Sequence, residues 1–339
     1  MIAVTGGSGF FGIAFVEALL KRGAHVRVLD REEIDESFRG RVDFRKVDIR
    51  DRDLVIRGLQ GSDVVYHNAA VVPISKAKAD FWAINEKGTR HVLEGAEKGG
   101  AKRVIFYSTS QSLFGISPKL PVTEDTPQNP FGDYGLSKHA AEKICEEYRA
   151  RGMNLSIIRP RTIIGAGRLG IFQILFEWIR KGSPVYMIGD GTNRLQFVGL
   201  QDLIDISLRL LDTGDNEDFN VGTDRFGTLR EDLEGLIHHA GTRSRLVFCP
   251  GWVAKPGLAL LDKLGMSPFV DLHYRTIDHS FYFDISKAKR VFGWSPKQSN
   301  LEALIEAYDW YVARADEILK STGTTHRKAV KKGILSFLR

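Results

Sequence analysis

The sequence predicts an α/β fold in which a doubly wound parallel sheet is joined to a smaller C-terminal lobe of mixed helices and strands. Two observations lead to this prediction. Short apolar runs rich in Val and Ile alternate with segments of helical periodicity from the first residue onward, which is typical of buried parallel strands joined by crossover helices. The alternation stops after Pro160, where Gly-rich and aromatic-rich stretches follow, and this change indicates the second lobe.

The first half of the chain supplies the predicted sheet. Its strands are expected at residues 2–5, 25–30, 42–48, 63–67, 103–108 and 155–159. Apolar residues recur between these runs with a period of about 3.6, and the crossover helices are expected at 11–22, 53–59, 81–98 and 134–151. Because parallel strands are joined by right-handed crossovers, this order predicts one sheet with helices on both faces.

A glycine-rich turn joins the first predicted strand to the first helix. It reads Gly6-Gly7-Ser8-Gly9-Phe10-Phe11-Gly12. Glycines let the backbone turn tightly and approach a pyrophosphate closely, and the helix N-terminus offers free N–H groups and a partial positive charge. Between a strand and a helix, the motif predicts a Rossmann-type dinucleotide site.

The end of the second predicted strand selects the cofactor. Asp30 lies 18 residues beyond Gly12, where a carboxylate accepts hydrogen bonds from the ribose of NAD and repels the 2′-phosphate of NADP. Asp30 therefore favours NAD. Because Arg31 could bind the 2′-phosphate, NADP stays open. After the third strand, Asp48 and Ile49 are expected beside the adenine; the alternative for Asp48 is the N-cap of the next helix.

Beyond the sheet, further helices are expected at 172–181, 200–211 and 229–240, and strands at 219–221 and 246–249. The predicted NAD-binding domain covers residues 1–165, and residues 197–222 return to it. The predicted substrate lobe comprises residues 166–196 and 223–312, and a basic amphipathic tail covers 320–339.

Tyr134 and Lys138 stand four residues apart and therefore on one face of a predicted helix. A free phenol loses its proton near pH 10. A nearby ammonium group and the positive nicotinamide ring favour the phenolate and bring its pKa toward neutrality. The pair therefore predicts proton transfer in a hydride-transfer enzyme.

These motifs occur in an order that resembles the extended short-chain dehydrogenases/reductases, the NAD-dependent epimerase/dehydratase family, which includes nucleotide-sugar epimerases and dehydratases and the 3β-hydroxysteroid dehydrogenases. The resemblance spans roughly residues 1–312. Besides the glycine turn and the Tyr134/Lys138 pair, the matching motifs are His67-Asn68-Ala69-Ala70, Asn85 with Gly88-Thr89, residues 108–115, Arg159-Pro160, Phe197-Val198 with Asp202, residues 219–222, Lys287-Ala288 and residues 293–296.

The resemblance implies a Ser-Tyr-Lys site. Ser110 would hydrogen-bond the reacting oxygen of the substrate, Tyr134 would be the general base or acid, and Lys138 would bind the nicotinamide ribose and polarise the tyrosine. The expected cofactor contacts are Gly6, Gly9, Phe10, Phe11, Gly12, Asp30, Arg31, Asp48, Ile49, Asn68, Ala69, Ala70, Asn85, Ser108, Tyr134, Lys138 and Pro160.

One departure from the family bears on the reaction. Sugar 4,6-dehydratases of this family carry an Asp-Glu pair directly after the catalytic hydroxyl residue. Gln111 and Ser112 follow Ser110 here, so elimination of water is not expected. Oxidation of a secondary alcohol, or oxidation followed by re-reduction, is the reaction class that remains.

Two substrate classes stay open. Arg275 and Asp278 match the Arg-x-x-Asp spacing with which nucleotide-sugar epimerases hold diphosphate and ribose, and Arg168 is a further candidate contact; the alternative is a surface ion pair between Arg275 and Asp278. The rival class is a 3β-hydroxysteroid or sterol-type dehydrogenase, because the apolar segment 252–269 could line a greasy pocket. The preferred interpretation of that segment is the ordinary core of the small lobe.

Charge and composition narrow the remaining possibilities. The formal net charge is +6, but residues 320–339 hold six basic residues and no acid, so the rest of the chain is balanced and no nucleic-acid partner is expected. Neither a metal nor a signal peptide is expected. The family habit implies a homodimer paired through residues 134–151. We expect a cytoplasmic enzyme, and one interpretation of the tail is peripheral contact with the inner membrane face.

Overall fold

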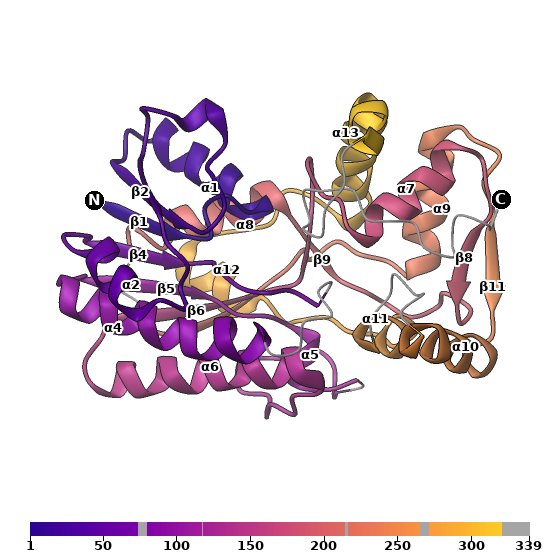
Figure 1. Cartoon of the computed structure of the whole chain (residues 1–339). Coiled ribbons are helices and arrows are strands. Elements are labelled where there is room, and N and C mark those ends of the chain that lie inside the picture. Colours follow the sequence, from indigo (N-terminus) through magenta and orange to yellow (C-terminus); the bar gives the residue numbers. More distant parts are fainter. Residues whose placement is uncertain (74–79, 117, 214–215, 265–270, 321–339) are drawn as a thin grey trace.

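A parallel sheet forms the centre of the computed structural model, which describes residues 1–73, 80–116, 118–213, 216–264 and 271–320 (Figure 1). In this part of the chain seven strands lie in the order β10-β6-β5-β4-β1-β2-β3, and every neighbouring pair is parallel. The strands are β1 (Ile2–Thr5), β2 (Val26–Asp30), β3 (Asp43–Lys46), β4 (Val64–His67), β5 (Arg103–Tyr107), β6 (Leu155–Pro160) and β10 (Asp218–Val221). The predicted fold class is confirmed.

The strand order reverses between β1 and β4. From β1 the chain adds β2 and β3 on one side, and from β4 it adds β5, β6 and β10 on the other. Thr5 at the end of β1 lies beside His67 at the end of β4. Open α/β sheets bind ligands in the crevice outside the carboxyl ends of the strands at such a reversal, so the glycine turn after Thr5 begins at the expected position.

Helices cover both faces of the sheet (Figure 1). On one face α1 (Phe10–Lys21) and α8 (Leu200–Arg209) bury their apolar sides against β-strand residues such as Tyr66. On the other face α2 (Arg52–Leu59), α4 (Thr89–Gly99) and α6 (Gly132–Ala150) pack on residues such as Val65. Because both faces are buried, inner strands such as β1 and β4 are largely apolar, whereas the edge strand β3 is polar and partly exposed.

The helix predicted at 81–98 is divided in the structure. It starts with a π-helix, η2 (Phe81–Gly88), and continues as α4. Two shorter elements are a 3₁₀ turn, η1 (Glu36–Phe38), and α5 (Gln111–Phe114). Wide π turns often mark functional positions, and η2 carries Asn85, one of the predicted site residues.

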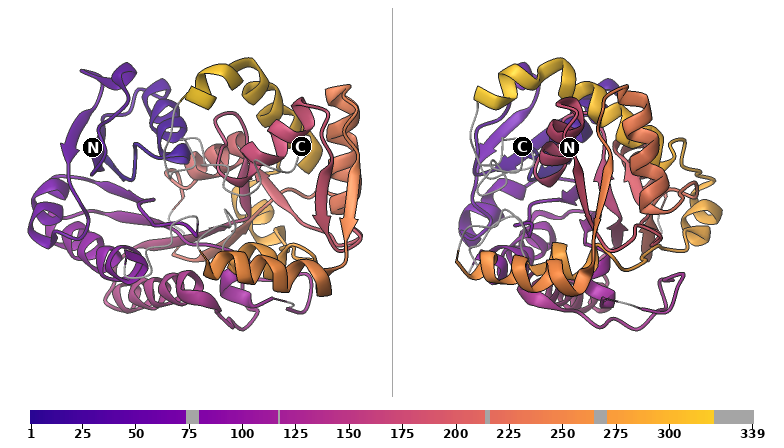
Figure 2. Two further views of the ribbon diagram at one scale, coloured as in Figure 1. Left: turned by 45° about the vertical axis from the view of Figure 1, so that its right-hand side comes forward. Right: turned by 90° about the vertical axis from the view of Figure 1, so that its right-hand side faces the viewer.

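The second lobe lies at the end of the molecule opposite α2 and α4 (Figure 2). β8 (Val185–Ile188) pairs in parallel with β11 (Leu246–Cys249), and β7 (Thr162–Ile164) pairs in parallel with β9 (Phe197–Gly199). The helices of this half are α7 (Ile171–Arg180), α9 (Leu229–Ala240), α10 (Gly251–Lys263), α11 (Asp271–Thr276) and α13 (Asn300–Lys320). Helix α12 (Ser286–Phe292) packs on β10 of the main sheet, where the ring centres of Phe292 and Phe219 lie 4.6 Å apart. Strands β7, β8 and β9 and helices α10 to α13 were not predicted from the sequence, and the lobe boundaries stay predictions.

The predicted core role of the segment 252–269 is wrong where the structure describes it. No residue of α10 is buried, and Trp252 is 82% exposed. The opposite side of the helix, with Ala254 and Leu258, lines a cavity. The rest of the segment, residues 265–270, and the tail 321–339 lie outside the described residues, among which no helix is long and apolar enough to cross a membrane.

Candidate active site

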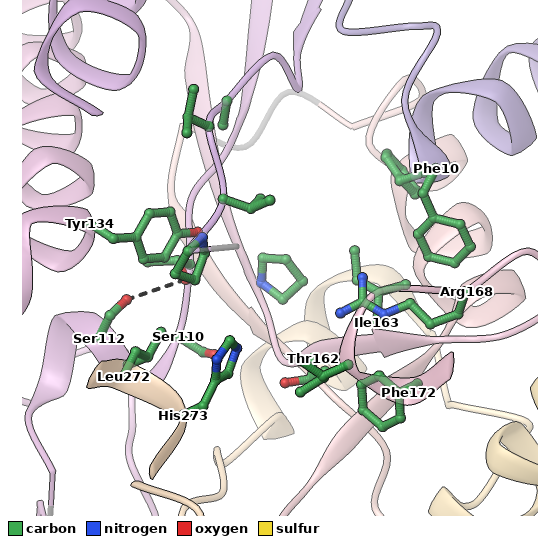
Figure 3. A pocket seen from close by; sticks show the side chains of 18 of the residues that line it. Phe10, Ser110, Ser112, Tyr134, Thr162, Ile163, Arg168, Phe172, Leu272 and His273 are labelled. Atoms are coloured by element: carbon green, nitrogen blue, oxygen red, sulfur yellow. Dashed lines mark hydrogen bonds between the residues drawn. The ribbon is translucent and has the colours of Figure 1, made fainter. Parts of the chain in front are cut away.

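A cavity of about 1240 Å³ runs from the glycine turn to the second lobe. Residues at or beyond the carboxyl ends of β1 to β6 form one side of it, and residues of α7, β8, α9, α10 and α11 form the other. Ligand pockets usually measure roughly 300–1,000 Å³, so this cavity has room for a dinucleotide and a second molecule. Figure 3 shows Phe10 and Arg168 on one side of the cavity and Tyr134 and Ser110 across it.

The glycine turn brings bare backbone to the cavity wall. Gly6 has a φ of +73°, and a Cβ atom on it would lie 2.7 Å from the backbone nitrogen of Ala69. A side chain on Gly12 would overlap the carbonyl oxygen of Gly6. Gly9 is the N-cap of α1 and lines the cavity. The N-terminus of α1 and its unpaired N–H groups are therefore available to an anionic group.

Most of the predicted cofactor contacts line this cavity: Gly6, Gly9, Phe10, Phe11, Asp30, Arg31, Asp48, Ile49, Asn68, Ala69, Ala70, Ser108, Tyr134, Lys138 and Pro160. Gly12 and Asn85 lie behind its wall. The buried Asn85 side chain binds the main chain of Val71, accepting from its nitrogen at 2.8 Å and donating to its oxygen at 3.1 Å. Asn85 therefore holds the loop after β4 in place, and Gly12 permits close packing of α1 on the turn.

Asp30 is fixed beside the glycine turn by two backbone groups. The N–H groups of Ser8 and Glu32 donate to its carboxylate at 2.9 and 3.0 Å. Burial raises the pKa of Asp30, and these hydrogen bonds oppose that effect. Arg31 lies 3.7 Å from the carboxylate of Glu32, and Glu33 also lines the cavity. Glu33 pairs with Lys46 at 2.7 Å. The carboxylates of Asp30 and Glu32 beside Arg31 make this end unfavourable for a 2′-phosphate.

Asp48 lines the next part of the cavity. Its carboxylate binds Arg50 at 2.6 Å, and the Arg50 guanidinium holds the pKa of Asp48 below its usual value. The N-cap of α2 is Asp51, whose side chain accepts from the Leu54 nitrogen at 3.0 Å. The alternative prediction that Asp48 caps this helix is therefore wrong.

Tyr134 and Lys138 lie one turn apart at the start of α6, and both side chains are turned into the interior. Burial raises the pKa of Tyr134, and a hydrogen bond with the Thr109 side chain lowers it. Lys138 Nζ donates to the carbonyl of Tyr107 at 2.7 Å and lies 4.2 Å from the centre of the Phe106 ring. Burial lowers the pKa of Lys138 to about 8. Desolvation is the larger of the two effects on Tyr134. The lowering of its pKa by Lys138 together with the positive nicotinamide ring stays a prediction.

Ser110 is the N-cap of the short helix α5 and is hydrogen-bonded to Arg161, a residue outside the motifs found in the sequence. Arg161 Nη1 donates to Ser110 Oγ at 2.9 Å, and its Nε donates to the carbonyl of Gln196 at 2.9 Å. Since Ser110 Oγ accepts from the guanidinium, its own hydroxyl hydrogen is left to donate into the cavity. Ser110, Arg161 and Tyr134 all line the cavity.

Arg168 is a second buried guanidinium in the same cavity. It lies 5.7 Å from the centre of the Phe10 ring and 5.4 Å from that of Phe172. Its Nε is buried without a hydrogen-bond partner among the described residues, and burial lowers its pKa to about 10. Burial and the nearby Arg168 lower the pKa of His273 to about 4, so His273 is neutral and the local charge is that of the arginine.

The other two predicted substrate contacts do not line the cavity. Arg275 is half-exposed on α11 and pairs with Asp271 at 3.0 Å. Asp278 pairs with Lys255 at 2.8 Å. Of the four predicted substrate contacts, Ser110 and Arg168 therefore line the cavity, and Arg275 and Asp278 lie outside it.

Comparison with known proteins agrees with this geometry. Residues 2–222 match the model of the NAD dependent epimerase/dehydratase family. The chain is 38% identical over 336 residues to the uncharacterised protein y4nG of Sinorhizobium fredii, covering 99% of this chain and 84% of the relative. It is 29% identical over 322 residues to a putative UDP-glucose 4-epimerase of Methanocaldococcus jannaschii, covering 91% and 98%. The crystal structure of the Thermotoga maritima UDP-glucose 4-epimerase with UDP-glucose superposes with a TM-score of 0.78 at 27% identity, covering 93% of this chain and 99% of that one.

The chain belongs to the NAD-dependent epimerase/dehydratase family. It is an enzyme of that family and its cofactor is NAD, as predicted. The residues present fit the dinucleotide: Gly6 leaves no side chain beside Ala69, α1 presents its N-terminus, and the Asp30 carboxylate is held next to the glycine turn by the Ser8 nitrogen.

Proposed function

We propose that this enzyme oxidises a secondary alcohol of a nucleotide-activated sugar and, as an epimerase, reduces the resulting ketone again from its other face. The observation that carries the proposal is the meeting of Ser110, Tyr134 and Lys138 in one cavity with the glycine turn. The size of the cavity and the two buried guanidinium groups of its substrate half add support, since arginine binds phosphate oxygens well.

Three side chains would carry the proton and hold the substrate. Bound NAD supplies the acceptor for the hydride. Ser110 donates its hydroxyl hydrogen to the reacting oxygen and so keeps it in line. Tyr134 takes the hydroxyl proton during oxidation and returns it during reduction. Lys138, whose pKa burial lowers to about 8, favours the phenolate when it is charged.

The side chains after Ser110 support oxidation–reduction over dehydration. Gln111 and Ser112 line the cavity in the place where an acid and a base would be needed to remove water. Ser112 Oγ donates to Thr109 Oγ1 at 3.5 Å, and Thr109 in turn binds the Tyr134 hydroxyl. Ser112 is thus linked to the Tyr134 hydroxyl through Thr109.

Arg168 is the side chain that we assign to the diphosphate. Its guanidinium is buried between two aromatic rings without an acidic partner among the described residues. An unpaired buried cation is costly unless a ligand neutralises it. Arg275 and Asp278 have no part in the proposed site, because they pair with other residues outside the cavity.

A sterol-type alcohol is the second candidate, favoured by the apolar side chains of the far wall: Ile174, Leu175, Trp178, Leu229, Leu233, Ala254 and Leu258. The charges of the cavity favour the nucleotide sugar. A neutral sterol would leave the guanidinium groups of Arg161 and Arg168 without water and without an anion.

The test is to incubate the NAD-loaded enzyme with UDP-sugars and with 3β-hydroxysteroids. Interconversion of sugars without net NADH supports an epimerase, and stoichiometric NADH from a UDP-sugar supports a dehydrogenase. NADH formed from a steroid alone would overturn the proposal. Tyr134→Phe is expected to reduce turnover at least 100-fold while NAD binding, measured by calorimetry, stays close to that of the wild type; a fully active variant would refute the role of Tyr134.

A further inference from the structure

We propose that Arg161 forms a carboxylate subsite beside the reacting carbon, so that the sugar of the substrate is a hexuronic acid. This inference rests on the proposed function, and it adds a substrate class and a specificity-determining residue to it.

Arg161 is held rigidly between β6 and β7. Its backbone nitrogen donates to Val221 at 2.8 Å, and its guanidinium lies 4.4 Å from the centre of the Phe281 ring. Hydrogen bonds to Gln196 and Ser110 occupy Nε and Nη1. Nη2 makes no hydrogen bond to any described residue, although Arg161 lines the cavity. One end of the guanidinium is thus fixed by the protein and the other end is available to a ligand.

The charge of Arg161 has no counterpart among the described residues. Burial lowers its pKa to about 9, and no carboxylate opposes that effect. Arg159, two residues earlier and equally buried, binds Glu142 at 2.7 Å and Asp218 at 2.7 Å. The fold therefore supplies acids to the buried guanidinium of Arg159 and, among the described residues, none to that of Arg161. The missing acid at Arg161 is best explained by an acid that arrives with the substrate.

The position of Arg161 fixes where that acid must be. Ser110 is assigned to the reacting oxygen, and Arg161 is bound to the same Ser110 hydroxyl. Nη2 belongs to the same guanidinium as the Nη1 that binds Ser110, so it lies close to the reacting oxygen. In a hexuronic acid the C6 carboxylate is attached to C5, which is bonded directly to the C4 carbinol. A hydroxymethyl group in its place would accept a hydrogen bond but would leave the charge unpaired.

The inference is tested by comparing UDP-glucuronic acid with UDP-glucose and UDP on the NAD-loaded enzyme, with affinity from calorimetry and kcat/KM from turnover. Charge-assisted hydrogen bonds should favour the acid over the neutral sugar about 10- to 100-fold. Arg161→Gln should bring the ratio of the two affinities close to one. Arg161→Lys, which keeps the charge but loses the fork, should retain part of the preference.

Arg168→Gln is the matched control, because it removes the other buried arginine of the cavity. It should weaken UDP, UDP-glucose and UDP-glucuronic acid by a common factor and leave their ratio unchanged. Equal wild-type affinity for acid and neutral sugar, or an unchanged ratio in Arg161→Gln, would overturn the inference and leave the proposed function intact. Failure of all three UDP compounds to bind would overturn both. The wild-type comparison is decisive even if a variant does not fold.

Discussion

Acid pH should destabilise the enzyme through His67, which lies beneath the cofactor loop. His67 is almost fully buried. Its Nδ1 lies 2.8 Å from Thr5 Oγ1 and its Nε2 lies 3.0 Å from Thr89 Oγ1. Burial, with a smaller effect of Lys138, lowers the pKa of His67 from 6.5 to about 3. The folded protein therefore keeps this imidazole neutral in mild acid.

The direction and size of the effect follow from linkage. Between pH 6.5 and about 3 the unfolded chain binds a proton at His67 that the folded chain does not bind, so the free energy of unfolding falls as the pH falls. At pH 5 the loss from this group is about 2 kcal/mol relative to pH 7.

The assay is urea unfolding at pH 7 and pH 5 for the wild type, His67→Gln and His238→Gln. His67→Gln should be less stable at pH 7 but should lose about 2 kcal/mol less on acidification. His238 is exposed on α9, and its variant should keep the wild-type difference. If His67→Gln loses as much stability between pH 7 and 5 as the wild type does, the reasoning about this buried histidine is refuted.

Three further substitutions probe the turn, the cofactor choice and the core. Gly12→Ala places a methyl group against the Gly6 carbonyl and should lower the NAD affinity measured by calorimetry at least about 10-fold. The control Gly257→Ala, with open space around the residue, should bind NAD with wild-type affinity. Asp30→Asn should lower the kcat/KM preference for NAD over NADP about 10-fold; an unchanged preference would show that another group selects the cofactor. Glu142→Gln removes a carboxylate from a buried ion pair and should lower the free energy of unfolding by about 3 kcal/mol, against less than about 1 kcal/mol for the exposed Glu146→Gln.

The sheet and the cofactor turn could be predicted from the sequence because their signals are local. A buried parallel strand is an uninterrupted apolar run, and a pyrophosphate turn needs its glycines within a few consecutive residues. The predicted strand at 2–5 coincides with β1, and the predicted helix at 229–240 coincides with α9. In α9 the signal is complete, since Thr228 and Glu231 form a capping box.

The second lobe was harder to predict because an apolar pattern does not say what it packs against. The sequence of α10 is apolar on more than one side. The prediction that it belongs to the core of the small lobe assumes that all of these sides pack against protein. In the structure Ala254 and Leu258 line the cavity, while Leu260 is 59% exposed and Leu264 is 61% exposed. The Arg-x-x-Asp spacing of Arg275 and Asp278 predicts a substrate contact. The position of Arg275 on the outer side of α11 depends on how the whole lobe packs and cannot be read from that spacing.

Arg159 and Arg161 show why the substrate half of the site needed the three-dimensional structure. In the sequence they flank Pro160 as two equivalent basic residues at the end of one strand. Residues far away in the chain distinguish them, because Glu142 and Asp218 bind the side chain of Arg159. Among the described residues the guanidinium of Arg161 contacts Gln196, Ser110 and aromatic rings. An acid that is missing from a fold cannot be recognised from a motif. It is recognised only when the partners of each buried charge have been located in three dimensions. The unpaired guanidinium of Arg161 is the reason to test acidic sugars as substrates.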